Sequence, residues 1–106
     1  MIGDRDPDPH VPAALMALAG GHGRLLWHKS KRWASASFSG SRDEVAFEYF
    51  GREAVELAEL ALAALGESEI AVPGRTVADA CVSWQRRLHR PDVRLVAVID
   101  LLLVED

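Results

Sequence analysis

Cysteine and long apolar runs are scarce in this chain of 106 residues, and each scarcity excludes a class of protein. Cys81 is the single cysteine, so no intrachain disulfide can form and nothing in the cysteine usage indicates an oxidising compartment. No apolar run approaches the length of a membrane span, and the first residues lack the basic-then-apolar order of a secretory signal. We therefore expect a cytoplasmic protein that does not bind membranes.

Net positive charge is also lacking. The 12 Lys and Arg residues are outnumbered by 16 Asp and Glu residues, which gives a formal charge of -4 and argues against a general affinity for nucleic acid. The charges are unevenly placed, because acids fill 4–8, 43–59 and 67–69 whereas bases gather at 24–32 and 86–94. A local basic patch is therefore compatible with the composition.

The length indicates one domain, because 106 residues can bury one core but not two. Residues 1–9 carry acidic side chains and two prolines, so they are expected to form a flexible acidic N-terminal segment. The remaining residues, 10–106, are expected to form a single α+β domain.

The clearest period-two run in the chain is Trp33–Ser39, in which alanines and a phenylalanine alternate with serines. Turn residues follow at 39–43, and apolar side chains then alternate again over 45–49. Before this run, residues 24–27 are expected to be extended and residues 29–32 to form a polar interruption. The predicted pairs of the resulting hairpin are Ala34 with Tyr49, Ala36 with Phe47 and Phe38 with Val45.

Two helices are expected. Pro12 suits a first helical turn, and the apolar residues that follow continue to Ala19, where a glycine-rich stretch ends the helix. The second helix spans Arg52 to Leu65 and carries a wide apolar sector that includes Leu57 and Leu60. Residues 69–72 are then expected to add a short edge strand before the turn at 73–74.

A second hairpin is predicted from residues 76–88 and 93–104, around the loop at 89–92. The side of this hairpin that faces away from the helices is expected to hold a mixture of polar and apolar residues, among them Gln85 and Arg87. The predicted pairs on the helix-facing side are Val82 with Ile99, Ala80 with Leu101, Ala78 with Leu103 and Trp84 with Ala97.

The sequence also shows a possible internal repeat. A shift of 44 positions places Trp33–Ser39 on Val77–Ser83, and it places the first helix on the second, for example Val11 on Val55. Because Ala and Leu are common in any helix, chance similarity is the alternative explanation.

These elements predict an α+β fold of two layers, in the order α-β-β-α-β-β, with one antiparallel sheet of four to five strands and both helices on one face. The other face is then uncovered, and its apolar residues form a patch of the kind that marks a contact surface. A homodimer with two-fold symmetry, in which two sheets stack face to face, is the simplest solution. The predicted binding residues are Val96, Val98, Leu102, Ser35, Ser37 and Trp84.

Asp79 and Asp100 are the candidate catalytic residues, because each is an acid inside a strand-like stretch. They are expected to lie diagonally on the uncovered face, where like charges raise the pKa of one carboxyl group and create an acid/base pair. The alternative is that both reach solvent or bond to hydroxyl groups such as that of Ser83. No nucleophile or oxyanion donor is evident, so the sequence favours a non-enzymatic protein.

Metal and thiol chemistry find little support. The acidic neighbours expected around Cys81 oppose thiolate formation, so it is interpreted as a passive, half-buried thiol. The four histidines lack the close spacing of a zinc site, and no further cysteine accompanies them: they are His10, His22, His28 and His89. We expect no metal and no cofactor.

Two segments, 24–33 and 84–94, interleave basic and aromatic residues, as surfaces that bind single-stranded nucleic acid do. A solvated rim, in which tryptophans pack under the aliphatic parts of basic side chains, is the favoured reading because the total charge is negative. The basic residues concerned are Lys29, Lys31, Arg32, Arg86, Arg87 and Arg90.

The sequence therefore predicts a small association domain that forms a homodimer or joins a larger protein partner through its uncovered sheet face. One alternative is a small enzyme or ligand-binding protein with a pocket between sheet and helices or at the dimer seam, where Trp84 and Tyr49 are further residues of interest. The other is a nucleic-acid-binding module that uses the two basic segments.

Overall fold

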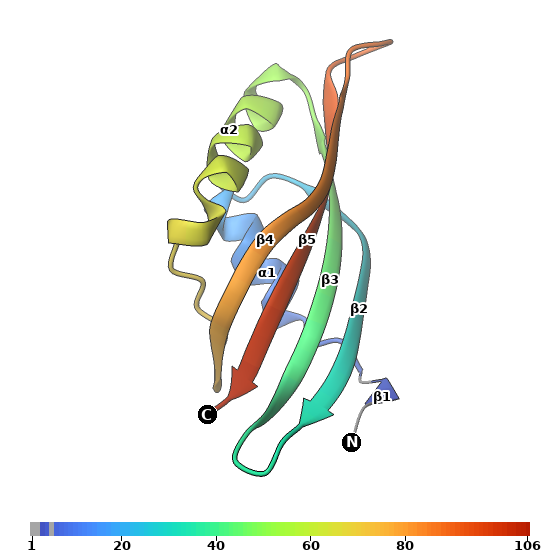
Figure 1. Ribbon diagram of the computed structural model, residues 1–106. Helices are drawn as coiled ribbons and strands as arrows, with labels where there is room; N and C mark the ends of the chain where they lie inside the picture. Colours follow the sequence, from blue (N-terminus) through green and yellow to red (C-terminus); the bar gives the residue numbers. More distant parts are fainter. Residues whose placement is uncertain (1–2, 5) are drawn as a thin grey trace.

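A computed structural model describes residues 3–4 and 6–106 (Figure 1). After a two-residue strand, the described chain follows the predicted order α-β-β-α-β-β, which confirms the α+β class. The elements are β1 (Gly3–Asp4), α1 (His10–Leu18), β2 (Arg24–Ala34), β3 (Ser39–Phe50), α2 (Arg52–Ala63), the 3-10 turn η1 (Leu65–Glu67), β4 (Arg75–Leu88) and β5 (Arg94–Glu105).

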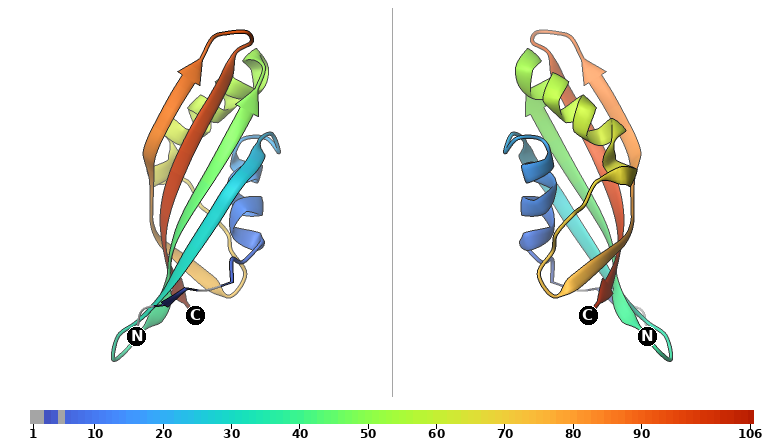
Figure 2. Two further views of the ribbon diagram at one scale, coloured as in Figure 1. Left: turned by 90° about the vertical axis from the view of Figure 1, so that its right-hand side faces the viewer. Right: turned by 90° about the vertical axis from the view of Figure 1, so that its left-hand side faces the viewer.

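One antiparallel sheet organises the described residues, with the strand order β1-β2-β3-β5-β4. The two long central strands, β3 and β5, therefore come from different hairpins, and β2 and β4 flank them. Figure 2 shows both helices on the same side of this sheet, so the predicted two-layer arrangement is confirmed. Neither helix is long and apolar enough to cross a membrane within the described residues.

The hydrophobic core lies between the helices and the alternate residues of β3 and β5 that face them. Val45, Phe47 and Tyr49 are at most 2% exposed, because α1 and α2 cover them. Burial raises the pKa of the Tyr49 hydroxyl to about 12. The other core residues include Val11 and Leu15 of α1, Val55, Ala58 and Leu62 of α2, and Leu95, Ala97, Ile99, Leu101 and Leu103 of β5.

Helix α2 buries a narrower face than its sequence predicts. Val55, Ala58 and Leu62 follow the spacing of one helical stripe and are at most 8% exposed. Leu57 and Leu60 fall outside this stripe and are 39% and 70% exposed, so they do not face the sheet as expected. The apolar sector was overestimated because leucine also serves as a good helix former on exposed positions.

The predicted first hairpin is wrong. Strand β2 runs without interruption from Arg24 to Ala34, and residues 35–38 form the turn instead of a strand. Ser35 stabilises this turn, because its backbone N–H donates to the Phe38 carbonyl at 2.7 Å and its Oγ accepts from the Phe38 N–H at 3.1 Å. The observed partners are Ala34 with Ser39, His28 with Val45 and Leu25 with Phe47, while Ala34, Ala36 and Phe38 are exposed.

The second hairpin matches its prediction in the middle and departs from it at both sides. Val82 pairs with Ile99 and Ala80 pairs with Leu101, as expected. Two β-bulges in β4, between Val77 and Asp79 and between Val82 and Trp84, shift the register elsewhere. Consequently Val77 instead of Ala78 pairs with Leu103, Trp84 pairs with Val98 instead of Ala97, and Gln85 and Arg87 lie on the helix-facing side.

The shift of 44 positions does not relate equivalent strands. It aligns Trp33–Ser39, which ends one strand and contains a turn, with Val77–Ser83 in the middle of β4. The reason is the length of the connections: five residues separate α1 from β2, whereas the connection from α2 to β4 contains η1 and is longer. A duplication of the α-β-β unit stays a prediction, which the repeated element order alone does not decide.

The segments outside the main strands are short. Residues 69–72 do not form the expected strand, since Val72 makes only an isolated bridge with Arg75 within the described residues. In the N-terminal segment, Gly3–Asp4 pairs with Arg32 and Lys31 of β2. Residues 1, 2 and 5 of this segment lie outside the described residues, and the flexibility expected of 1–9 stays a prediction.

Candidate functional site: the open face of the sheet

The face of the sheet that turns away from both helices is the candidate site, and we call it the open face. Strand pairing defines its members, because directly paired residues share a face and successive residues alternate. They are Arg24, Trp27, Lys29, Lys31 and Trp33 of β2, Gly40, Arg42, Glu44, Ala46, Glu48 and Phe50 of β3, Arg94, Val96, Val98, Asp100, Leu102 and Val104 of β5, and Thr76, Asp79, Cys81, Trp84, Arg86 and Leu88 of β4.

An apolar row crosses the open face from one edge to the other. Trp27 pairs with Ala46, Ala46 with Val98, and Val98 with Trp84, so a tryptophan stands at each end of the row. Trp84 is 50% exposed, and Trp27 and Val98 are half-buried. All three tryptophans of the chain, including Trp33, lie on this face. Tryptophan is the residue most enriched among the energetic centres of protein interfaces, so the row has the chemistry of a contact surface.

The second bulge of β4 determines the position of Trp84. Because both Val82 and Ser83 lie opposite Ile99, the strand gains one residue and the next side chain returns to the open face. The Ser83 hydroxyl donates to the Val98 carbonyl at 3.2 Å and thereby bonds to the neighbouring strand at the bulge. Regular alternation alone would have turned Trp84 toward the helices.

Four of the six predicted binding residues are brought together, and two are not. Val96 and Val98 lie in adjacent rows of β5, with Trp84 beside Val98 on β4, and Leu102 lies two rows further along β5, beyond Asp100. Ser35 and Ser37 instead lie in the β2–β3 turn, beyond the end of the sheet, because the run that contains them is not a strand. They are not part of the open face.

A charged groove of about 550 Å³ lies next to the apolar row. Its basic side comes from Lys29 and Lys31 of β2 and Arg42 of β3. Its acidic side chains include Asp79 of β4 and Asp100 of β5. Glu44 and Cys81 also line the groove. Asp43 of β3 contributes to the lining too, but it pairs with His28 on the opposite side of the strand. Within the described residues, none of the other six charged side chains forms an ion pair.

Asp79 and Asp100 lie diagonally across the groove, as predicted. Asp79 pairs with Leu102, two positions along β5 from Asp100. Asp100 itself lies between Glu44 and Cys81 in one row. No serine or histidine lines the groove, and its thiol, Cys81, pairs with Asp100, whose negative charge opposes formation of the reactive thiolate.

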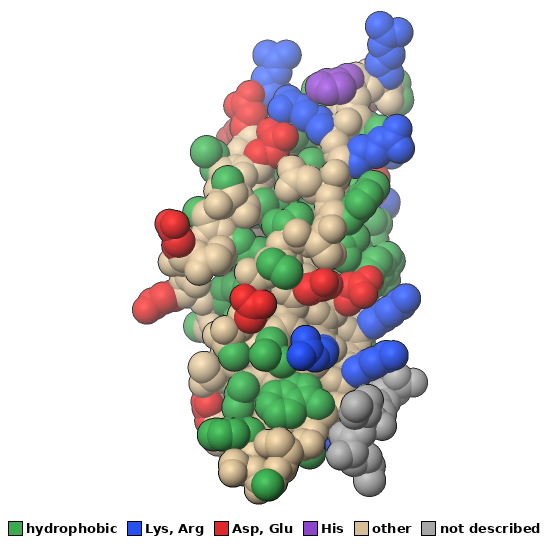
Figure 3. All heavy atoms as spheres, in the orientation of Figure 1, with side chains coloured by type: hydrophobic (Ala, Val, Ile, Leu, Met, Phe, Trp, Pro, Cys, Tyr) green, Lys and Arg blue, Asp and Glu red, His purple; other side chains and the backbone are tan. Residues whose placement is uncertain are grey.

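The end of the open face nearest the β4–β5 loop is basic. Glu48 is only 8% exposed and bonds to Arg24 at 2.5 Å and to Arg94 at 3.3 Å, while the Arg24 guanidinium also lies over the Phe50 ring. Arg86 lies in the same row of the sheet as Arg24 and Glu48. Figure 3 shows several Lys and Arg side chains around this loop, acidic side chains beside them on the α2 side, and further acidic side chains near the middle of the molecule.

The predicted basic residues do not form one patch. Lys29, Lys31 and Arg86 lie on the open face, but Arg32 and Arg87 lie on the opposite side of their strands. Arg87 is bound to Glu59 of α2 at 2.8 Å, so its charge is compensated within the fold. The last predicted residue, Arg90, is in the β4–β5 loop.

Cys81 is exposed and is not the half-buried thiol that the sequence suggested. Its row partner is Asp100, and Lys29 lies in the same row beyond Glu44. The thiol therefore reports directly on access to the groove, which makes it a natural probe for anything that covers the open face.

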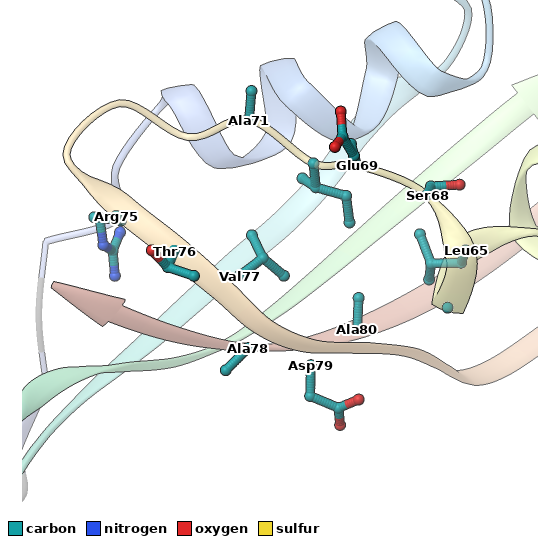
Figure 4. A pocket seen from close by; sticks show the side chains of 12 residues that line it. Leu65, Ser68, Glu69, Ala71, Arg75, Thr76, Val77, Ala78, Asp79 and Ala80 are labelled. Carbon is teal, nitrogen blue, oxygen red and sulfur yellow. The ribbon is translucent and has the colours of Figure 1, made fainter. Parts of the chain in front are cut away.

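A second cleft, of about 470 Å³, lies on the helix side of the β4 edge (Figure 4). The connection 65–71 forms one wall, and Val77 and Ala80 point toward it from β4. Asp79 points away from this cleft in Figure 4, in agreement with its place on the open face. Small apolar residues share the lining with polar ones, but Ser68 donates to the Ala64 carbonyl and Arg75 is engaged with Ser41 and Asp8, so these polar groups are already used within the fold.

Sequence reasoning missed a cluster of buried polar side chains between the sheet and the helices. His28 and Asp43 are 5% and 0% exposed, and His28 Nε2 donates to Asp43 Oδ2 at 2.6 Å. The other carboxylate oxygen accepts from Ser30 Oγ at 3.0 Å and from Ser41 Oγ at 2.6 Å. Burial raises the pKa of Asp43, but these hydrogen bonds from His28, Ser41 and Ser30 together outweigh it and hold the pKa below its ordinary value.

Arg75 extends the buried cluster to Asp8 in the N-terminal segment. Its Nη2 donates to Ser41 Oγ, and its Nη1 lies 3.5 Å from Asp8 Oδ2. Asp8 also accepts from the backbone N–H of His10 at 3.0 Å, and this bond lowers the pKa of Asp8. The cluster thus joins β2, β3, the beginning of β4 and Asp8, which lies two residues before α1.

The buried cluster is not a catalytic triad. In a triad the serine donates to the histidine, whereas Ser30 and Ser41 both donate to Asp43 and leave no activated nucleophile. The signal that could have revealed it is the alternation of His28 and Ser30 in one strand, with Asp43 in the next. Sequence reasoning instead assigned Asp43 to a turn.

Comparison with protein-family models, with curated proteins and with solved structures finds no match for this chain. Within the described residues, no group of three or more His, Cys, Asp or Glu side chains is placed to hold a metal ion. The case for a function therefore depends on the geometry of the open face.

Proposed function

We propose that this protein is a non-enzymatic association domain that forms a homodimer through its open face. The observation that carries the proposal is the concentration of all three tryptophans, with Val96, Val98 and Leu102, on the side of the sheet that no helix covers. An aromatic and apolar row with unpaired charges beside it is typical of a surface that a second protein covers.

The size of the open face suits a homodimer of modest affinity. Four strands spaced about 4.8 Å apart and about ten residues long present roughly 600 Å² per copy, so stacking two copies buries roughly 1,200 Å². This value lies at the lower end of the range for specific interfaces. Permanent homodimers generally bury about 2,000 Å² or more, so we expect a dimer that dissociates on dilution.

The edges of the sheet support stacking of faces over pairing of edges. Strand β4 is a long edge strand, but its two bulges, at Ala78 and Ser83, interrupt the regular ladder that a second strand would need. On the other edge, β1 already pairs with Lys31 and Arg32 of β2. The open face carries no such protection.

The two rival functions receive less support. The buried His28–Asp43 pair has no activated nucleophile, and the groove contains carboxylates without a partner for acid/base chemistry. For single-stranded nucleic acid, Trp27 and Trp84 offer stacking surfaces beside Lys29. Glu44, Asp79 and Asp100 repel phosphates from the middle of the same face, however, and the whole chain is acidic.

Sedimentation equilibrium across a concentration series tests the proposal. The double variant Trp84→Ser/Val98→Ser removes the apolar row at two positions on adjacent strands and is expected to weaken dimerisation at least about tenfold. The matched control is Leu60→Ser on α2, which changes a residue that is 70% exposed and outside the open face. It should leave the dimer unchanged.

Labelling of the Cys81 thiol gives a second reading, since the dimer is expected to slow its modification as the protein concentration rises. A wild-type protein that stays monomeric at about 100 µM would overturn the proposal. If a single-stranded oligonucleotide quenches the tryptophan fluorescence and high salt abolishes this quenching, the result would favour the alternative that the open face binds nucleic acid. The cytoplasmic location stays an expectation and is not needed for either test.

A further inference from the structure

We propose that the outer edge of β2 binds an extended, acidic segment of a partner protein, which joins the sheet as an edge strand. This inference goes beyond the proposed function, because it concerns an edge of the sheet and a different partner, and it does not require the homodimer. The observations behind it are a regular stretch of β2 that no described strand covers and the charge of that strand.

Strand β2 is paired with β3 along one side, but on its other side β1 pairs only with Lys31 and Arg32. Figure 1 shows β1 beside the lower end of β2 alone. The ladder with β3 is regular from Trp27 onward, because its one register shift falls between Leu25 and Trp27. Residues 27–30 therefore form a regular edge that pairs with no described strand, and every second residue there turns its backbone N–H and C=O groups outward.

The backbone of this edge is accessible. The side chain of His28 is only 5% exposed, yet the residue as a whole is half-buried and not buried, so its backbone supplies much of the exposed surface. Strand β4 at the opposite edge differs, since two bulges interrupt its ladder. A regular and accessible edge is the feature that β-strand addition uses, with main-chain hydrogen bonds for affinity and alternate side chains for specificity.

The charge of β2 selects the kind of partner. Cross-strand pairs of opposite charge stabilise a sheet, whereas like charges directly opposite one another destabilise it. The β2 edge of a second copy would bring cations against cations, so this edge opposes pairing with itself. An acidic strand gains at the same positions. The strand contains no acid, and its four cations are Arg24, Lys29, Lys31 and Arg32.

Strand β1 occupies one end of the same edge and shows the mode of binding. It is antiparallel to β2, with Gly3 opposite Arg32 and Asp4 opposite Lys31. A partner strand that pairs with residues 27–32 must take the place of β1, because an edge position accepts one strand at a time. Since β1 is only two residues long, it competes weakly with a longer strand.

Helix α1 determines the other side chains of the partner. Figure 2 shows α1 on the helix side of the sheet, at its β2 edge. Ala14, Met16 and Leu18 of this helix are half-buried, so the added strand meets apolar surface on its inner side. Successive residues of a strand alternate between its two faces. The partner therefore needs acids opposite the lysines and apolar residues between them.

Fluorescence anisotropy with a labelled peptide tests the proposal. The probe is acetyl-Gly-Asp-Val-Glu-Val-Thr-amide, which begins with the two residues of β1 and places Glu opposite Lys29 in the same register. We expect saturable binding with a dissociation constant below about 1 mM. A peptide with Lys in place of Asp and Glu, and one with Pro in place of both Val residues, should each bind at least about tenfold more weakly, because one loses the charge and the other the backbone donors.

Charge reversal in the protein gives a matched test. Lys29→Glu/Lys31→Glu is expected to bind the acidic peptide at least about tenfold more weakly and to bind the Lys-containing peptide instead, a gain that loss of folding would not produce. The control is Arg86→Glu, which reverses an exposed cation of β4 at the opposite edge and should leave binding unchanged. Gly3→Pro/Asp4→Pro removes the backbone N–H groups of β1 and is expected to raise the affinity for the acidic peptide at least about threefold.

Hydrogen exchange locates the contact, since the acidic peptide should slow exchange of the backbone amides within 27–30 and leave β4 unchanged. Absence of binding at about 1 mM, equal binding of the three peptides, or protection confined to β4 would overturn the proposal. An unchanged affinity in Gly3→Pro/Asp4→Pro would also count against it, because β1 would then not share the site. A single-stranded oligonucleotide that binds more tightly than the acidic peptide, and no longer binds Lys29→Glu/Lys31→Glu, would assign β2 to nucleic acid instead and overturn it.

Discussion

Replacement of Asp43 by alanine is expected to destabilise the fold strongly. The carboxylate accepts three hydrogen bonds, from His28 at 2.6 Å, from Ser41 at 2.6 Å and from Ser30 at 3.0 Å, and its side chain is fully buried. Each buried donor that loses its acceptor costs about 1–3 kcal/mol, and removing one partner of a buried charged pair costs about 3–5 kcal/mol. Since the hydroxyl groups can rotate, we expect a loss of about 3–5 kcal/mol in the free energy of unfolding.

Urea unfolding followed by tryptophan fluorescence at neutral pH measures this loss. The control is Asp92→Ala in the exposed β4–β5 loop, which is expected to change the free energy of unfolding by less than about 0.5 kcal/mol. A loss below about 1 kcal/mol for Asp43→Ala would refute the reasoning, because it would mean that the buried hydrogen bonds add little to stability.

The pH dependence separates charge from packing at the same position. The pKa of Asp43 is lowered in the folded state from its ordinary value of 3.8, so its stabilisation is present above that value and is lost as the pH falls through the folded pKa. Asp43→Asn keeps the shape but cannot titrate. The difference in unfolding free energy between wild type and Asp43→Asn should therefore shrink below pH 3.8, whereas a constant difference would contradict the assigned pKa direction.

Two further substitutions test the packing. In Gly40→Ala the new Cβ would lie 1.9 Å from the Leu103 carbonyl oxygen, so the β3–β5 ladder must shift and we expect a lower melting temperature. The control is Gly66→Ala, whose Cβ meets no atom within 4 Å and which should leave the melting temperature unchanged. In Leu62→Ala the lost burial on α2 is expected to cost about 2–4 kcal/mol, whereas Leu60→Ala should cost less than about 0.5 kcal/mol. Equal costs for the two leucines, in thermal or urea unfolding, would contradict the assigned face of the helix.

The parts of the fold that the sequence predicts are those where side-chain size and turn chemistry agree. In the second hairpin, Ile99 and Leu101 flank Asp100, and the loop before Val93 contains Pro91 and Asp92. Large apolar side chains must face the core, so the central register could be predicted within one residue. The helices were predicted for the same reason, from apolar positions ended by glycine.

The first hairpin could not be predicted in this way, because both faces of β2 are largely polar. Lys29 and Lys31 belong to the open face, while His28 and Ser30 face the core side, where Asp43 satisfies them. A strand whose buried residues are polar shows no apolar alternation. The Ala and Ser residues at 33–39 did alternate between apolar and polar, but their side chains are too small for that alternation to specify which of them are buried.

The buried cluster was hidden for a related reason. A histidine, two serines and an aspartate are each common on surfaces, and only their placement opposite one another makes burial affordable. His28 pairs with Val45 and Ser30 pairs with Asp43, so the strand register is required before the hydrogen bonds can be inferred. The wrong register of the first hairpin therefore concealed the cluster as well.

The two bulges of β4 link the shape of the sheet to its proposed use. Each inserts one residue into an edge strand, which interrupts the ladder and opposes edge-to-edge pairing with another chain. The bulge at Ser83 also returns Trp84 to the open face, where it completes the row that begins at Trp27. One local irregularity thus disfavours contact through the edge and supplies an aromatic side chain to the face, and this double effect is the structural reason to look for association through the face.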